Sequence, residues 1–395
     1  MFFVSSISGA QMPREKPFEE LLNKNLAFAA EQYILMTNEI SDKPGQFPRT
    51  LNENGNLVTC YSGYWTSGFF SGSLWYLYSE TGEQKFKELA EKFTFYQEYL
   101  QYSITNHDIG WIINCSAQNG YRTTQNEYYK KIVVQSAKSL VTRFSPIVAC
   151  IRCWDEKEWT IKLGLTFPVN IDNMMNLELL TSAYEYTGDS LFLDIAVKHA
   201  DKTIENQFRD DYSSYHVINY DSTGKVKNKK TVQGYSDNSS WARGQAWGLY
   251  GFTMMYRETA LPRYLKQAIN IANFITSHQN LPEDKIPYWD FDSPEIPNTL
   301  RDASAAAIMC SALIELSQYV DKDQSEEYLS IARQQLVSLS SDQYRSKLGK
   351  NGFFLLKHSV GGLPTNFEVD VPQNYADYYF IEALIRYKKY LIENQ

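Results

Sequence analysis

Apolar residues recur along this chain at helical spacing, in pairs of neighbouring segments. One short pattern marks the second segment of each pair, in which an aromatic residue is followed four positions later by an alanine. It occurs at Phe86 and Ala90, Phe192 and Ala196, Tyr264 and Ala268, and Tyr328 and Ala332. Because the alanine lets a helix approach its neighbour and the ring fills the adjoining space, the pattern predicts a repeating pair of helices.

The first helix of each pair is predicted by the apolar segment that precedes the pattern. These segments are Gly72–Tyr78, Leu177–Tyr186, Gly248–Tyr256 and Ala305–Tyr319. A threonine stands five residues before the aromatic residue in three of the four cases, at Thr81, Thr187 and Thr259. Further helices are expected at Phe18–Ile40, Asn126–Thr142 and Asn374–Ile392, for a total of about a dozen. Alternation typical of strands is confined to Ser214–Tyr220 and Gly352–Leu356.

These segments predict one all-α domain, an (α/α)6 barrel that spans residues 13–395. No linker rich in glycine, serine or proline divides the chain. An open solenoid of the tetratricopeptide type is the alternative, but the repeat intervals are irregular and the connections are long. The long connections are Gln46–Trp65, Thr142–Asn170, Asp210–Trp241 and Pro282–Asp302. They hold much of the aromatic and charged content, as the rim of a pocket would.

The composition narrows the class of ligand. The chain of 395 residues has 29 Tyr, 21 Phe and 8 Trp, which favours carbohydrate stacking as well as core packing. A net charge of −8 argues against nucleic acid as a partner. An anionic substrate stays possible, because one basic pocket can overcome a modest net charge. No apolar stretch reaches the roughly 20 residues of a membrane span.

The cysteines and the N-terminal segment give weaker indications. The Cys-x-x-Cys motif at Cys150 and Cys153 has no second pair to complete a zinc site, so buried or half-buried thiols are expected, with a redox or metal role as the alternative. No metal or cofactor is expected, since no two histidines have metal-ligand spacing and no glycine-rich phosphate loop occurs. Met1–Gln11 resembles the end of a secretory signal. We therefore expect residues 1–12 to be its remnant and the protein to be periplasmic, with the cytoplasm as the alternative.

A cation and two indoles are concentrated in one predicted helix. Arg243 and Trp247 are four residues apart and share a helix face, as do Trp241 and Gln245. A bidentate cation beside flat rings suits a ligand with a carboxylate and a sugar ring. A surface salt bridge next to core tryptophans explains the same residues equally well.

Two aspartates upstream of this helix are candidates for acid–base chemistry. Asp108 and Asp172 each lie at the start of a predicted helix and in apolar surroundings. Burial raises the pKa of a carboxyl group, and a second carboxylate nearby raises one of the pair further. The alternative is that each aspartate simply caps its helix.

The five histidines divide into two groups. His107, beside Asp108, and His216 are candidates for hydrogen bonds to a substrate. The other three lie in polar helical or loop settings and are expected to be structural or at the surface: His199, His278 and His358.

Taken together, the motifs resemble those of the unsaturated glucuronyl hydrolases, glycoside hydrolase family 88. The resemblance runs through nearly the whole chain. It covers residues 65–70 (WTSGFF), 107–110 (HDIG), 171–176 (IDNMMN), 233–235 (QGY), 241–247 (WARGQAW), 301–304 (RDAS) and 374–379 (NYADYY). The resemblance implies an (α/α)6 barrel. It also implies a hydrolase that removes a Δ4,5-unsaturated uronic acid from the non-reducing end of lyase-generated glycosaminoglycan-type oligosaccharides, by hydrating the C4=C5 vinyl ether.

The same resemblance implies roles for individual residues. Asp172 is similar to the family's general acid/base, and Asp108 to its partner carboxylate. Stacking on the sugar is implied for Trp65, Phe69 and Trp247, and hydrogen bonds to it for Gln233, Arg243, His107 and His216. A monomer or homodimer with an unsaturated uronyl oligosaccharide as its substrate is expected. The alternatives are an unsaturated rhamnogalacturonyl hydrolase, a non-catalytic sugar-binding helical protein and a polysaccharide lyase.

Overall fold

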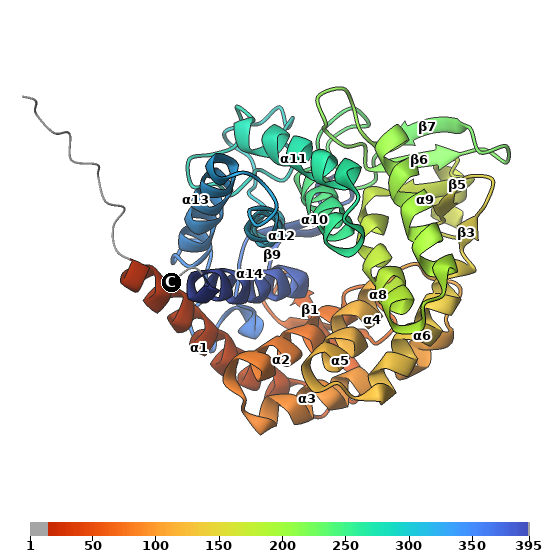
Figure 1. The fold of residues 1–395 in the computed structure, drawn as a ribbon. Coiled ribbons are helices and arrows are strands. Elements are labelled where there is room, and N and C mark those ends of the chain that lie inside the picture. The colour runs from red at the N-terminus through yellow and green to blue at the C-terminus, as the bar shows by residue number, and fades with distance from the viewer. Residues whose placement is uncertain (1–14, 394–395) are drawn as a thin grey trace, which may run out of the picture.

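The computed structural model describes residues 15–393, which form two concentric rings of helices (Figure 1). The outer ring contains α1 (Glu15–Glu39), α3 (Gln84–Phe95), α6 (Glu127–Val141), α9 (Ser190–Gln207), α11 (Pro262–Ser277) and α13 (Lys322–Leu339). The inner ring contains α2 (Ser67–Thr81), the continuous run of α4 (Ile109–Ile113), η2 (Asn114–Gln118) and α5 (Asn119–Thr124), then η3 (Ile171–Asn176) with α8 (Leu177–Thr187), α10 (Ala242–Thr259), α12 (Ala303–Leu316) and α14 (Asn374–Glu393). Outer and inner elements alternate along the chain, as in an (α/α)6 barrel.

The inner ring is closed. Each inner helix packs against the next in chain order, and α14 packs against both α12 and α2. Every residue of α12, from Ala303 to Leu316, is buried, because this helix is covered by α13 outside and by its inner neighbours on both sides. The closure confirms the predicted barrel and excludes the open solenoid. The seven helices that were predicted with residue ranges are all present, with ends that differ by a few residues, and so are the four outer helices marked by the aromatic–alanine pattern.

The repeated threonine marks the turn from an inner helix to the next outer helix. Thr81, Thr187 and Thr259 are the last residues of α2, α8 and α10. Each hydroxyl donates to the carbonyl four residues earlier, at 2.6 to 2.7 Å, and accepts from the backbone N–H two residues later. The aromatic residues and alanines that follow are buried in the outer helices, with at most 2% of their surface exposed. The pattern of threonine, aromatic residue and alanine therefore corresponds to a hydrogen-bonded turn followed by a packed outer helix.

One of these turns is strained, and this gives a testable prediction. The residue after the threonine is left-handed in all three turns: Gly82 at φ 67°, Gly188 at φ 71° and Ala260 at φ 53°. The left-handed conformation costs an L-residue with a Cβ about 1 kcal/mol. Ala260→Gly should therefore raise the free energy of unfolding by about 0.5 kcal/mol, after the larger unfolded-state entropy of glycine is subtracted. Urea denaturation measures it, and a loss of stability would contradict the strain argument.

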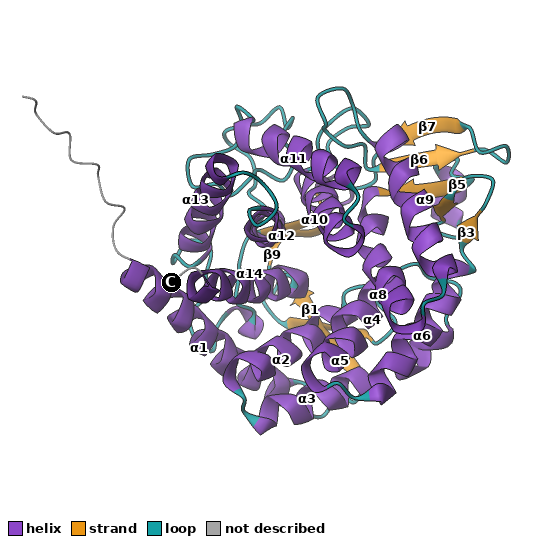
Figure 2. Ribbon diagram, in the orientation of Figure 1, coloured by secondary structure: helices purple, strands orange, loops and turns teal. Residues whose placement is uncertain are grey.

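Short antiparallel strands occupy the connections from outer to inner helices (Figure 2). They are β1 (Gln46–Leu51) with β2 (Leu57–Tyr61), β3 (Phe144–Ser145) with β4 (Cys150–Ile151), the sheet of β5 (Phe167–Asn170), β6 (Val217–Tyr220) and β7 (Val226–Lys230), and β8 (Ser359–Gly362) with β9 (Phe367–Val371). A short helix, α7 (Glu158–Lys162), lies between β4 and β5. Because these connections all lead into inner helices, the strands gather at the end of the barrel where the inner helices begin.

The two strand predictions have different outcomes. Ser214–Tyr220 contains β6, which confirms the first. The strand predicted at Gly352–Leu356 is wrong, because Asn351, Gly352 and Phe353 take positive φ values of 58° to 70° and form a tight turn. The extended segment begins later, at β8.

All five cysteines are buried with free thiols, as predicted for structural residues. Burial raises the pKa of Cys150 and Cys153, which keeps both protonated near neutral pH. No helix within residues 15–393 is long and apolar enough to cross a membrane. The segment Met1–Gln11, on which the periplasmic prediction depends, lies outside the described residues.

Candidate active site

Asp172 is a buried carboxyl with one unpaired oxygen. It is the second residue of η3, directly after β5, and 8% of its surface is exposed. Within residues 15–393 its Oδ2 has no hydrogen-bond partner. Burial raises the pKa of Asp172 to about 7, the charge of Arg243 opposes the rise, and the charge of Asp108 adds to it. The group can thus donate or accept a proton near neutral pH.

His216 presents an N–H group to this carboxyl. It lies directly before β6, and its Nδ1 accepts hydrogen bonds from the backbone N–H of Val232 at 3.0 Å and of Gln233 at 3.3 Å. Burial and the charge of Arg243 lower the pKa of His216 to about 3, so the ring is neutral and its proton is on Nε2. Nε2 is 3.7 Å from Asp172 Oδ2, which is too long for a hydrogen bond. Neither atom has a hydrogen-bond partner within residues 15–393.

Asp108 occupies the position before α4 and is held by His107. The His107 Nε2 is 3.1 Å from Asp108 Oδ1. On the other side of the ring, Asn176 Nδ2 is 3.0 Å from Nδ1. Nδ1 also lies 2.9 Å from Asn173 Oδ1. Burial lowers the pKa of His107, so the ring is neutral and either donates from Nε2 to Asp108 or donates from Nδ1 to Asn173. The ring therefore orients the carboxylate of Asp108.

The capping interpretation is wrong for both aspartates. Asp108 is at the cap position of α4 but its side chain makes no capping hydrogen bond. Asp172 is inside η3, whose cap residue is Asn170. The two helix starts meet closely because Gly110 has no side chain, since a Cβ there would lie 2.5 Å from that of Asn176. The contact brings the two carboxyl groups to one site.

The predicted stacking residues divide into a surface layer and a core layer. Trp65 is partly exposed and lines a pocket of about 440 Å³ together with Asp108. Phe69 and Trp247 are buried, at 1% and 0% exposure, and their rings pack behind Trp65 against Trp111. Trp65 is thus the one of the three that reaches this pocket, while the other two support it.

Arg243 is fully buried and its guanidinium bonds to the protein. Nη1 donates to Asp302 Oδ2 at 3.1 Å and to the carbonyl of Val360, and Nη2 donates to the carbonyl of Gly361 at 2.6 Å. The guanidinium carbon lies 4.4 Å from the centre of the Trp241 ring. The ion pair lies beside core tryptophans, as the alternative interpretation expected, but it is buried and not at the surface. In this position the cation fixes β8 to α10 and α12, and it acts on Asp172 and His216 through its charge.

Gln233 contributes to the same framework. Its side-chain amide donates to the carbonyl of Gly361 at 2.9 Å, and its backbone N–H faces His216. The loop that precedes α10 is thereby tied both to β8 and to the imidazole. Gln233 is only partly buried, so it lies at the edge of the site.

Several residues of the site were not identified from the sequence. Asn173 and Asn176 hold His107, and Asp302 pairs with Arg243. Trp154 packs edge-on against His216, with ring centres 6.3 Å apart, and lines the pocket. The asparagines fall within the motif at residues 171–176, which could have indicated them, whereas Trp154 lies in an irregular loop without any periodic pattern.

The other histidines are consistent with structural or surface roles. His199 is buried and accepts from the backbone N–H of Ile151, which anchors β4. His358 is exposed and pairs with Asp370 at 2.7 Å. Within residues 15–393 no three histidine, cysteine, aspartate or glutamate side chains are grouped as ligands for a metal ion.

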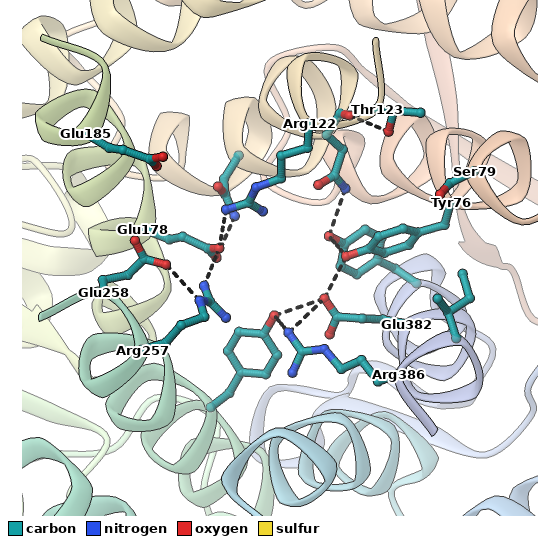
Figure 3. Close-up of a pocket in the computed structure, with 15 residues that line it drawn as sticks. Tyr76, Ser79, Arg122, Thr123, Glu178, Glu185, Arg257, Glu258, Glu382 and Arg386 are labelled. Carbon is teal, nitrogen blue, oxygen red and sulfur yellow. Dashed lines mark hydrogen bonds and ion pairs between the residues drawn. The ribbon is translucent and has the colours of Figure 1, made fainter. Parts of the chain in front are cut away.

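A second cavity, of about 500 Å³, lies toward the opposite end of the inner helices (Figure 3). Arg122 and Arg257 reach Glu178 from two sides, at 2.7 and 2.6 Å. Burial alone would raise the pKa of Glu178, but the two arginines outweigh it and lower the pKa to about 2. A carboxylate held ionised in this way cannot supply a proton near neutral pH. Glu178 is therefore not a candidate for the acid.

Comparison with known proteins shows which family the chain belongs to. The model of Glycosyl Hydrolase Family 88 matches residues 37–391. An unsaturated glucuronyl hydrolase from Formosa agariphila is 46% identical over 88% of this chain and 86% of its own. An unsaturated chondroitin disaccharide hydrolase from Streptococcus agalactiae is 32% identical over 82% of this chain and 81% of its own.

The fold leads to the same family. The crystal structure of an unsaturated glucuronyl hydrolase specific for heparin superposes with a TM-score of 0.90, at 43% identity, and covers 95% of this chain and 99% of the other. The enzyme from a Bacillus species superposes with a TM-score of 0.84 at 28% identity, over 94% of this chain and 96% of its own. From the family match, the identities and the barrel, we conclude that this chain belongs to glycoside hydrolase family 88.

Proposed function

We propose that this protein removes a Δ4,5-unsaturated uronic acid from the non-reducing end of glycosaminoglycan-type oligosaccharides by hydrating its C4=C5 vinyl ether. The observation that carries the proposal is Asp172, a buried acid whose pKa is near 7, with a free oxygen beside a second carboxylate. The substrate class follows from the relatives, which are named as unsaturated glucuronyl and unsaturated chondroitin disaccharide hydrolases.

The proposed reaction uses Asp172 twice. Its carboxyl proton moves to C4, and positive charge develops at C5 and the ring oxygen, where the carboxylate of Asp108 stabilises it. A water oxygen then bonds to C5 while one of its protons returns to Asp172. The resulting hemiketal opens and releases the aglycone. His216 Nε2–H and the unpaired Asp172 Oδ2 are only 3.7 Å apart, so one substrate group can contact both.

The substrate carries a carboxylate, and the electrostatics of the site favour an anion. All six inner helices begin at this end of the barrel, so their partial positive charges face the site. Arg243 adds a buried guanidinium whose charge acts on Asp172, partly offset by its ion pair with Asp302. We propose that Trp65 stacks on the sugar, and that Phe69, Trp247, Gln233 and Arg243 contribute by holding the walls of the site.

The alternatives fit less well. A sugar-binding protein without activity does not need a buried carboxyl with an unpaired oxygen; Asp377, whose pKa burial also raises, has both oxygens bonded to backbone N–H groups. A polysaccharide lyase favours a set of Tyr, His and Arg in place of two carboxyl groups. The relatives that match most of the chain are named for glucuronyl and chondroitin substrates, which places the rhamnogalacturonyl alternative second.

The direct test is the ultraviolet absorbance of lyase-generated unsaturated disaccharides, which is lost when the double bond is hydrated. Heparin-derived disaccharides come first, because identity is 43% to the heparin-specific enzyme and 32% to the chondroitin disaccharide hydrolase. Chondroitin- and hyaluronan-derived disaccharides follow. Absence of hydration with all three, and with pectin-derived fragments, would reject the proposed function.

The pH dependence of kcat/KM tests the role of Asp172. Because the protonated carboxyl is the acid and burial raises its pKa to about 7, the rate should fall about tenfold per unit of pH well above 7. A series from pH 5 to pH 9 at constant ionic strength measures this. A rate that still increases at pH 8.5 would contradict the assignment.

Three features stay predictions. We propose that residues 13–395 act as one catalytic domain and that residues 1–12 precede it. We propose the periplasm as the location of the protein, with the cytoplasm as the alternative. A monomer or homodimer is the proposed assembly, which sedimentation would decide.

A further inference from the structure

His199 is a buried histidine that takes no part in the reaction proposed above. It lies in the middle of α9, in the outer ring (Figure 1), and none of its surface is exposed. Burial lowers the pKa of His199 to about 3, so the ring is neutral near pH 7. Its Nδ1 accepts the backbone N–H of Ile151 at 3.0 Å, which places the ring proton on Nε2. Within the described residues Nε2 has no hydrogen-bond partner, so the ring is held through Ile151.

The backbone of Ile151 connects His199 to the candidate active site. Ile151 is the last residue of β4, and the N–H of the next residue, Arg152, donates to Arg143 beside β3. The N–H and C=O groups of Ile151 itself face away from β3, because successive residues of an antiparallel strand turn these groups to opposite sides. The N–H donates to His199, and the carbonyl accepts from Asn173 Nδ2 at 2.8 Å. Ile151 is therefore held by α9 and by η3 at the same time.

Asn173 carries the connection onward to His107. Because the Ile151 carbonyl can only accept, the amide of Asn173 has its Nδ2 toward that carbonyl and its Oδ1 toward the imidazole. Oδ1 is 2.9 Å from His107 Nδ1, and His107 Nε2 is 3.1 Å from Asp108 Oδ1. The four residues that lead to Asp108 are each at most 1% exposed. These contacts, from His199 through Ile151, Asn173 and His107 to Asp108, form one buried chain.

We propose that His199 is a positioning residue for the hydration reaction, which sets the place of the Asp108 carboxylate through the buried chain. The inference rests on the proposed function and extends its machinery to the outer ring of helices. Without the Nδ1 acceptor, the N–H of Ile151 is left buried and unpaired, so β4 shifts to find a partner and Asn173 and His107 shift with it. Catalytic groups must be held within about 0.5 Å of their productive place, so such a shift lowers the rate.

The test removes the acceptor and then restores it. His199→Leu keeps a bulky apolar side chain but accepts no hydrogen bond, and it should lower kcat about tenfold while KM changes less than about twofold. His199→Asn places an amide Oδ1 near the position of Nδ1 and should return kcat to within about twofold of the wild type. His278→Leu is the matched control, because His278 Nδ1 also accepts a backbone N–H, from Asn280 at 3.1 Å, but lies at the end of α11, outside the buried chain. It should keep the wild-type kcat.

A pH profile separates positioning from a general loss of structure. Burial raises the pKa of Asp172 most, Arg243 opposes the rise, and the charge of Asp108 adds to it. When His199→Leu moves the Asp108 carboxylate away, the fall of kcat/KM above pH 7 should shift to lower pH by about half a unit. His199→Asn and His278→Leu should keep the wild-type profile. A variant that is only less stable loses active protein at every pH and leaves the profile in place.

Asn173→Ala breaks the buried chain at its middle link and replaces His199→Leu in the test if that variant does not fold. It should show the same lower kcat and the same shift. A wild-type kcat and pH profile in the folded variant, or an equal loss in His199→Asn, would overturn the inference. The pKa of Asp172 is also measured without substrate, by NMR of the carboxyl carbon in protein with isotope-labelled aspartate. A wild-type protein that hydrates no substrate would reject the proposed function, whereas an unshifted titration of Asp172 would reject the positioning role, so the two failures are distinguishable.

Discussion

Asp172→Asn should lower kcat/KM for unsaturated disaccharides by about a thousandfold or more. General acid–base catalysis contributes roughly 10² to 10⁴ to a rate, and in the proposed reaction this one side chain both donates the proton and takes it back. The amide has the same shape but no proton of suitable acidity. Initial rates from ultraviolet absorbance over a range of substrate concentrations measure the effect.

Ligand binding separates loss of chemistry from loss of structure in this variant. The amide keeps the size of the carboxyl, so Asp172→Asn should still bind the substrate. Its Tm should therefore rise when substrate is added, because a ligand that binds the folded state stabilises it. Asp210→Asn serves as the control. Asp210 is exposed and lies between α9 and β6, so this variant should keep normal rates. A kcat/KM of Asp172→Asn within tenfold of the wild type would contradict its role as the acid.

The barrel could be predicted because the sequence patterns that specify its helices and turns lie within short stretches of the chain. The threonine, the aromatic residue and the alanine of each repeat report one turn and one helix contact, and these recur within short windows of sequence. The strand at Gly352–Leu356 was mispredicted because alternation of apolar residues does not reveal positive φ values. The strand β8 was not predicted because its sequence, SVGG, has two glycines and little apolar alternation.

The site was predictable only in part, for a different reason. Apolar surroundings indicated that Asp108 and Asp172 would be desolvated, and the raised pKa of Asp172 agrees with that argument. Helical spacing placed Arg243 and Trp247 on one face, but spacing cannot tell whether the face meets a pocket or the core. The partner that decides it, Asp302, is 59 residues away in sequence.

Loop residues show the same limit more strongly. Trp154 and Lys157 lie between β4 and α7, in a segment without periodicity. Their position depends on Arg143, whose hydrogen bonds join two connections that are distant along the chain. Such contacts come from tertiary structure, so a single sequence gives no indication of them.

Glu178→Gln should lower the free energy of unfolding by about 3 kcal/mol at pH 7. Removing one partner of a buried ion pair typically costs about 3 to 5 kcal/mol. The low end applies here, because Arg122 is 41% exposed and Arg257 keeps its ion pairs with Glu258 and Glu315. Glu178 is 4% exposed and holds both Arg122 and Arg257, so it joins α8 to α5 and α10 across the inner ring. Urea denaturation at 25 °C measures the effect. Activity should stay within about twofold of normal, because Asp172 lies at the other end of the barrel.

The stability that Glu178→Gln loses should depend on pH in a defined direction. Arg122 and Arg257 lower the pKa of Glu178 from 4.5 to about 2, so its stabilising effect is complete above pH 4.5 and disappears as pH falls toward 2. The difference between wild type and Glu178→Gln should therefore be constant from pH 7 to pH 5 and shrink below. Glu185→Gln, on the same helix but exposed, should cost less than about 0.5 kcal/mol. If both variants lost equal stability, or if the difference stayed constant down to pH 3, the ion pairs around Glu178 would not be what stabilises this end of the barrel.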